Sequence, residues 1–216
     1  MSGGPHTRGE RGARSAQKPA VGRMFTTRNL VIAAAVGAVS SLLFAAITYL
    51  EITIQLTLPI LYVGFLGLYI FIPLLGLALF QLPLSGLLVA GIAGLVGATF
   101  TPFGPLLVPF ALVYAAVCEA FFAVGRYRRW QWWRYVLAGL VVGAATGMST
   151  TYFYSLDGGG RWADAGQAIP GGFGAVLLFA SSVFGHVVFA LLAWALARML
   201  HRMGLVRPHA PAPGRA

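Results

Sequence analysis

The feature that most constrains this chain is an uncharged stretch from Ile52 to Cys118, which contains no Asp, Glu, Lys or Arg. A helix that crosses a bilayer needs about 20 apolar residues, so this stretch alone has room for about three. Over the whole chain only 9% of the residues are charged, whereas soluble domains have about 25%. These features exclude a soluble enzyme, a nucleic-acid-binding domain and a disordered chain, and they predict a polytopic membrane protein.

Apolar runs bounded by Gly, Pro or charged residues predict an all-α, compact bundle of six transmembrane helices. The predicted spans are 30–50, 58–80, 84–100, 106–124, 135–154 and 173–200. The transmembrane domain then covers residues 29–204. The flanking segments 1–28 and 205–216 are basic or rich in Pro and Ala, so we expect two disordered tails.

The basic residues predict the orientation of the bundle. Of the 15 Lys and Arg residues, all except Arg161 lie in residues 1–28, 126–134 or 198–215. Cytoplasmic loops are enriched in Lys and Arg, so six helices with both termini in the cytoplasm fit this distribution. Glu51 and the segments 101–104 and 157–172 then lie outside. We therefore interpret the net charge of +10 as a topology signal, with lipid and not nucleic acid as the surroundings.

The sequence contains no enzyme motif that we can identify. It lacks the P-loop, the His-Glu-x-x-His and the Gly-x-Ser-x-Gly patterns. Ser181 and Ser182 precede His186, but no acid stands near to orient the ring. The single Cys118 allows no internal disulfide. We expect no catalytic site, no metal site and no cofactor.

Glu119 is the most informative candidate, because a carboxylate within a span is costly and usually functional. It lies seven residues before Arg126 in the fourth predicted span. It could bind a ligand, relay a proton or pair with Arg126, Arg129 or His186. Other polar or aromatic residues in the spans are candidate ligand contacts, with packing as the alternative; they are His186, Ser149, Tyr152, Tyr154, Tyr62 and Tyr69.

Small residues four positions apart lie on the first and third predicted spans. Ala34 and Ala38 form one such pair, and Gly94 and Ala98 form another. Such pairs let helices approach closely in lipid. They indicate either packing within the bundle or docking on another membrane subunit.

Several short motifs resemble those of the substrate-binding S components of energy-coupling factor (ECF) transporters. The resemblance is strongest over 83–154 and is greatest to the YkoE-like subfamily, which is associated with thiamine or hydroxymethylpyrimidine. The matching motifs are 102–105 (PFGP), 118–122 (CEAFF), 125–130 (GRYRRW) and 137–139 (LAG).

This resemblance implies a substrate-binding subunit without enzyme activity in a bacterial cell membrane. It would bind a vitamin-like heterocycle through Glu119 and aromatic residues, beneath a loop around 51–57. Ala34 and Ala38 would dock on a membrane coupling subunit that carries two ATPase subunits. Two alternatives stay open: a structural or assembly membrane protein without a solute ligand, and a proton-coupled carrier that uses Glu119 and His186.

Overall fold

The computed structural model describes residues 26–125, 127, 130–156 and 171–204. In this part of the chain there are helices and no strands, and a helix occupies each of the six predicted segments, so the predicted all-α membrane fold is confirmed. The helices are α2 (Thr27–Thr57), α3 (Pro59–Phe65), α4 (Leu68–Phe80), α5 (Ser85–Gly97), the short 3-10 helix η1 (Gly104–Leu106), α6 (Leu107–Val124), α7 (Trp132–Leu156) and α9 (Gly171–Arg202). Residues 1–25 of the predicted tail 1–28, the predicted tail 205–216 and the loop 157–170 lie outside the described residues. The prediction was wrong for Thr27 and Arg28, which already belong to α2.

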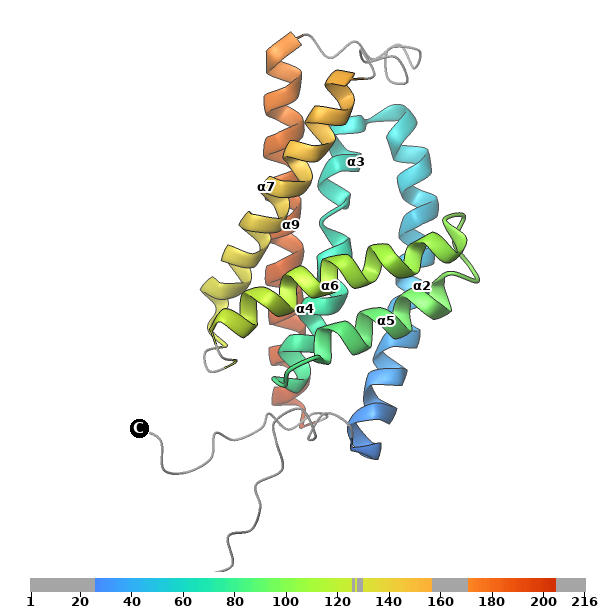
Figure 1. The fold of residues 1–216 in the computed structure, drawn as a ribbon, viewed down its shortest axis with the longest axis vertical. Coiled ribbons are helices and arrows are strands. Elements are labelled where there is room, and N and C mark those ends of the chain that lie inside the picture. The colour runs from blue at the N-terminus through green and yellow to red at the C-terminus, as the bar shows by residue number, and fades with distance from the viewer. Residues whose placement is uncertain (1–25, 126, 128–129, 157–170, 205–216) are drawn as a thin grey trace, which may run out of the picture.

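The helices differ in whether they can cross a membrane unaided. Within the described residues, four segments are long and apolar enough to do so: Thr27–Gln55, Ile60–Phe80, Gly104–Val124 and Gly174–Arg202. The third predicted span is shorter than expected, because α5 has 13 residues and is therefore about 20 Å long. In Figure 1, α5 and α6 run obliquely across α2 and α4.

Helix α4 forms the centre of the bundle. All of its residues, from Leu68 to Phe80, are buried, and it contacts α2, α5, α6, α7 and α9. In the membrane-spanning segments of α2, α6 and α9, by contrast, only 28%, 33% and 28% of the residues are buried. Because burial is confined to the inward faces of these outer helices, they expose broad apolar surfaces of the kind that faces lipid.

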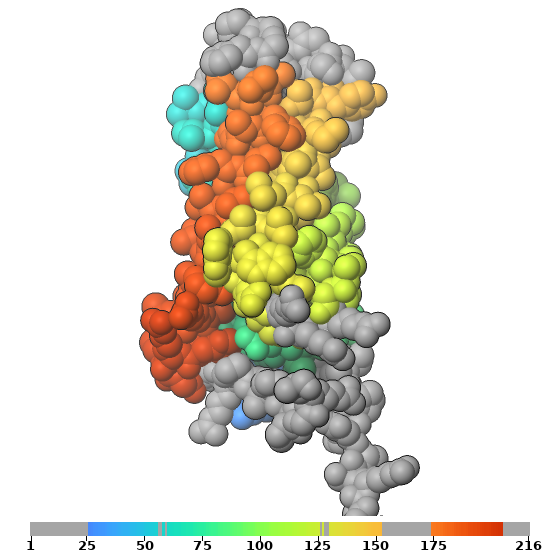
Figure 2. All heavy atoms as spheres, turned by 90° about the vertical axis from the view of Figure 1, so that its left-hand side faces the viewer, coloured from blue at the N-terminus to red at the C-terminus, as the bar shows by residue number. Residues whose placement is uncertain are grey.

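The second predicted span is broken between α3 and α4, and glycines at this break contact α9 closely. A side chain on Gly67 would place its Cβ 2.5 Å from the carbonyl carbon of Gly185 on α9, and one on Gly185 would overlap the carbonyl oxygen of Gly64. Glycine therefore lets the break pack directly on the backbone of α9. Gly139 and Gly143 of α7 also approach the backbone of α9 closely. Helices α7 and α9 run side by side along the face shown in Figure 2.

The first residues of α2 and the last residues of α9 lie at the same end of the bundle (Figure 1). We call this the basic end, because Arg28, Arg134, Arg198 and Arg202 belong to the helix ends there. This arrangement matches the even number of spans predicted from the sequence. The assignment of the basic end to the cytoplasm remains a prediction.

Candidate functional site

Glu51 is a buried carboxylate in the bundle, not a residue of an outer loop. The sequence prediction ended the first span at Leu50, but α2 continues to Thr57, so the expected loop over 51–57 is wrong. The side chain of Glu51 is only 3% exposed, and its Oε2 accepts a hydrogen bond of 3.2 Å from the hydroxyl of Tyr69 on α4. A carboxylate with an internal partner need not end an apolar helix.

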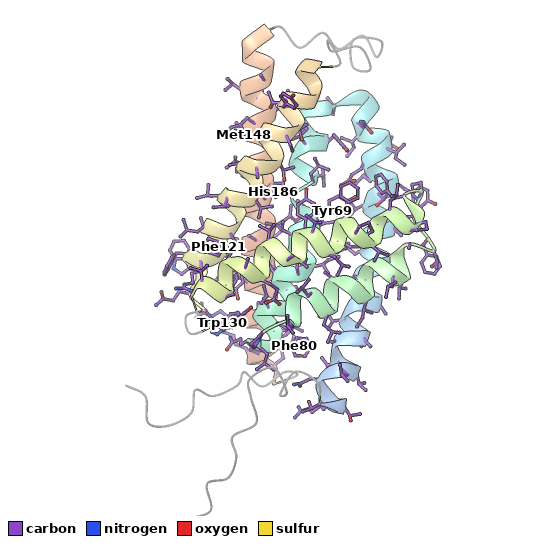
Figure 3. The ribbon with its side chains drawn as sticks, in the orientation of Figure 1. Tyr69, Phe80, Phe121, Trp130, Met148 and His186 are labelled. Carbon is purple, nitrogen blue, oxygen red and sulfur yellow. The ribbon has the colours of Figure 1, made fainter. Side chains whose placement is uncertain are left out.

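A row of aromatic rings connects four helices through the middle of the molecule. Phe44 of α2 lies 5.3 Å from Tyr69 between ring centroids, Tyr69 stacks on Tyr114 of α6 at 5.8 Å, and Tyr114 stacks on His186 of α9 at 6.5 Å. In Figure 3, Tyr69 and His186 both lie at mid-height of the bundle. We call Glu51, Tyr69, Tyr114 and His186 the central cluster.

The ring of His186 is fully buried and its orientation is fixed by its own helix. Nδ1 lies 2.8 Å from the carbonyl oxygen of Ser182. Because a carbonyl oxygen can only accept, Nδ1 carries the hydrogen, and Nε2 of the neutral ring is an acceptor. Gly143 allows this arrangement, since a Cβ there would lie 3.0 Å from the His186 Cβ.

Two polar atoms of the central cluster have no hydrogen-bond partner among the described residues. They are Oε1 of Glu51 and Nε2 of His186, and both are buried. An unpaired buried polar atom costs free energy of about 1–3 kcal/mol, so each such atom in a folded protein requires an explanation. Both atoms accept hydrogen bonds, and a molecule that carries N–H groups would satisfy them.

Further hydroxyl groups lie beside Glu51 and Tyr114. Tyr62 of α3 interacts electrostatically with Glu51 and Tyr114. The hydroxyls of Tyr114 and Thr146 lie 3.3 Å apart, which brings α7 to the cluster. The sequence prediction named Tyr62, Tyr69 and His186, and the structure brings all three together around Glu51 and Tyr114.

Glu119 lies apart from the central cluster, near the last turn of α6, toward the basic end of the bundle. Its Oε1 accepts a hydrogen bond of 2.8 Å from the backbone N–H of Gly86, and its Oε2 accepts one of 2.6 Å from the hydroxyl of Tyr127. Gly86 lies in the first turn of α5, and Leu84, which precedes this helix, makes no side-chain cap and has a φ of 67°. Glu119 therefore caps α5 from a neighbouring helix, where a negative charge is favourable.

Tyr127, in the turn after α6, acts as a hydrogen-bond donor to Glu119. Tyr127 has a φ of 52°, and its backbone N–H donates to the carbonyl oxygen of Phe122 at 3.2 Å. Partial burial and the hydrogen bond to Glu119 raise the pKa of Tyr127, so the phenol keeps its proton at neutral pH. Both oxygens of Glu119 are thus occupied within the protein, and a role in ligand binding stays a prediction.

The remaining predicted site residues lie apart from the central cluster or outside the described side chains. Ser149 is exposed and donates to the carbonyl oxygen of Thr146 on its own helix at 2.9 Å. Tyr152 is 60% exposed, and the side chain of Tyr154 is not among those described. Ala34 and Ala38 are exposed on α2, whereas Ala33 and Gly37 face inward and a Cβ on Gly37 would contact Ile92.

Sequence reasoning missed Glu51 and Tyr114 as site residues. A signal for Glu51 was present, because residues 52–58 continue the apolar character of the preceding span. In the described part of the chain no three His, Cys, Asp or Glu residues lie close enough to hold a metal ion.

The described residues form a multi-pass helical bundle with polar and aromatic groups at its centre. The sequence from 28 to 145 matches the family described as "ABC-type cobalt transport system, permease component". Because this match covers more than half of the chain, the protein belongs to that family. Glu51, Tyr69 and Tyr114 lie within the matched region, and His186 lies beyond it.

The fold is similar to a solved crystal structure of an S component of an ECF transporter. The TM-score is 0.66, the sequence identity is 20%, and the match covers 84% of this chain and 88% of that one. The predicted S-component fold is thereby confirmed, while the YkoE-like subfamily stays a prediction. No curated protein matches the chain.

Proposed function

We propose that this chain is the substrate-binding subunit of an ECF-type importer and that its ligand binds at the central cluster. The observation that carries this proposal is the pair of buried acceptors, Glu51 Oε1 and His186 Nε2, connected by stacked rings. A carboxylate in a membrane protein's interior is costly and is usually kept for function. Glu51 takes the role that the sequence had suggested for Glu119.

The chemistry of the cluster favours a flat, nitrogen-rich organic ligand. The rings of Tyr69 and Tyr114 already pack against each other and against Phe44 and His186, so a flat ligand would stack on them once these rings separate, and a cationic ring would also be attracted to them. An amino group would donate hydrogen bonds to the two acceptors. Thiamine and hydroxymethylpyrimidine both have an aminopyrimidine ring and fit these requirements.

The proposed transport cycle requires partner proteins. In an importer of this kind, two ATPase subunits and a membrane coupling subunit would reorient the binding subunit. The exposed residues Ala34 and Ala38 on α2 would dock on the coupling subunit through close helix contact. The concentration of arginine at the basic end supports an orientation in the bacterial cell membrane with both termini in the cytoplasm.

The experiment compares two buried carboxylates. Purified wild-type protein, Glu51→Gln and Glu119→Gln would be titrated by calorimetry with thiamine, hydroxymethylpyrimidine and Co²⁺. A hydrogen bond to a charged group contributes about 1.5–3 kcal/mol, so Glu51→Gln should weaken binding of the organic ligand by about 10-fold to 100-fold. Glu119→Gln should bind the organic ligand as tightly as the wild type, because Glu119 caps α5 and lies outside the central cluster.

Other outcomes would contradict the proposal in different ways. Equal affinity of Glu51→Gln and the wild type would remove the central cluster as the site. Binding of Co²⁺ without binding of either heterocycle would favour a metal substrate, in line with the family description. Binding of none of the three by folded protein would favour a structural role, and uptake that needs only the proton gradient would favour the carrier.

A further inference from the structure

A hollow of about 260 Å³ lies at the basic end, away from the central cluster. It is bounded by the end of α4, the segment before α7, the start of α7 and the last turns of α9. In Figure 3, Trp130 and Phe80 both lie at this end of the bundle. Six of the lining side chains have polar atoms: Gln81, Trp130, Tyr135, Trp194, Arg198 and His201.

Two of the lining side chains are held in place by hydrogen bonds. The indole N–H of Trp130 donates to the carbonyl oxygen of Tyr127 at 3.1 Å, and its ring stacks on Phe122 with 5.3 Å between centroids. Nε2 of His201 lies 3.0 Å from the carbonyl oxygen of Leu79 and must donate to it. Nδ1 of His201 is therefore the nitrogen left for another partner.

Arg198 supplies the positive charge of this hollow. Its guanidinium group lies 5.2 Å from the ring centroid of Trp194, four residues earlier on α9, so its position is favoured by a cation–π contact. The carboxylates of Glu51 and Glu119 are bonded to Tyr69 and to Tyr127. Arg198 thus presents a planar set of N–H donors that matches the oxygens of a phosphate group.

The surroundings of the hollow indicate where that phosphate comes from. Tryptophan concentrates at the level of lipid headgroups, and basic pockets between membrane helices bind anionic headgroups. At about 260 Å³ the hollow is smaller than the roughly 300–1,000 Å³ of pockets for drug-sized ligands, which suits a headgroup.

We propose that this hollow binds the phosphate group of an anionic phospholipid, with Arg198 as the main contact. The lipid would brace α9 against the α4–α5 turn and the segment before α7. This site is independent of the proposed substrate site, because the two share no residue.

The test measures lipid binding to delipidated protein in neutral detergent. Native mass spectrometry would count bound phosphatidylglycerol, phosphatidylcholine and inorganic phosphate at equal concentrations. We expect one phosphatidylglycerol to remain bound and the other two to bind at least about tenfold more weakly. Arg198→Gln should lower phosphatidylglycerol affinity by about tenfold, as for loss of one charge-assisted hydrogen bond.

The matched control is Arg202→Gln, which removes the same charge one turn later on α9 and outside the lining. It should keep the affinity, and Arg198→Lys should keep part of it because the charge remains. Equal losses in Arg198→Gln and Arg202→Gln would overturn the proposal in favour of general charge attraction. Equal binding of phosphatidylcholine, or binding of inorganic phosphate as tight as that of the lipid, would also overturn it. The proposal would also be overturned if Arg198→Gln bound phosphatidylglycerol as tightly as the wild type but no longer co-purified with the coupling subunit. The hollow would then be a contact with that protein.

Discussion

The Tyr127 hydroxyl donates a hydrogen bond of 2.6 Å to Oε2 of Glu119, and the other oxygen of the same carboxylate accepts the backbone N–H of Gly86. One side chain therefore joins the start of α5, the end of α6 and the turn that leads to α7. This arrangement gives a buried carboxylate a structural role that requires no ligand.

Loss of this donor should destabilise the protein. Tyr127→Phe leaves Oε2 of Glu119 unpaired in a buried position, and we expect the free energy of unfolding to fall by about 1–3 kcal/mol. Unfolding in mixed micelles with increasing sodium dodecyl sulfate would measure this change. Tyr49→Phe is the control, because Tyr49 is 58% exposed and should change stability by less than about 0.5 kcal/mol. Equal effects of the two variants would argue against the capping role of Glu119.

The contact of α3 with α9 should tolerate no side chain at Gly185. Gly185→Ala places a methyl group against the backbone of Gly64, and we expect a loss at the upper end of the about 1–3 kcal/mol that overpacking costs. Gly91→Ala is the matched change in α5, where the nearest atom would lie 3.5 Å away. It should raise stability by about 0.5–1 kcal/mol, since alanine favours helix. A stable Gly185→Ala protein would show that α3 can move away from α9.

Two tyrosines of the central cluster should differ in their contribution to stability without ligand. Tyr69→Phe removes the donor to a carboxylate, whereas Tyr114→Phe removes a bond between two neutral hydroxyls. Bonds to charged groups contribute about 1.5–3 kcal/mol and neutral ones about 0.5–1.5 kcal/mol. The fall in melting temperature in detergent should therefore be larger for Tyr69→Phe. The reverse order would indicate that Glu51 is not charged or is not bonded to Tyr69.

The exposed face of α2 should be required for assembly and not for folding. Ala38→Leu adds bulk on the outward side of α2, so the melting temperature of the isolated chain should stay within about 2 °C of the wild type, as for a surface change of under about 0.5 kcal/mol. Co-purification with the coupling subunit should fall by about tenfold if close helix contact is needed. Ala145→Leu makes the same change on the exposed side of α7 and serves as the control. Full assembly of Ala38→Leu would place the docking surface elsewhere.

The sequence predicted the helices well because apolar runs and their interruptions are local features. The α4–α5 turn illustrates this, since Gln81 to Leu84 separates two helices where the composition indicated a break. The roles of the two acidic residues were not predictable in the same way. Glu51 was assigned to a loop because a lone charge ends an apolar run, and its burial depends on the hydroxyl of Tyr69, which is 18 residues away.

The same limit applies to Glu119. Its position in a span indicated an unusual partner, and its partners are the Tyr127 hydroxyl and the backbone N–H of Gly86. Gly86 follows a turn whose left-handed residues Gln81 and Leu84 carry no clear sequence signal. Long-range contacts of this kind depend on how the helices pack, and composition does not specify them.

The enclosed position of α4 limits how a molecule could reach Tyr69. A helix with neighbours on every side has no free volume in which to swing, so a path to the aromatic rings must open by displacement of the surrounding helices. Helices α2 and α6 are suited to such movement, since each has a broad unpacked face. The distance between a pair of spectroscopic labels on α2 and α6 should therefore change when a ligand enters or leaves. The distance between two labels within α4 should stay constant.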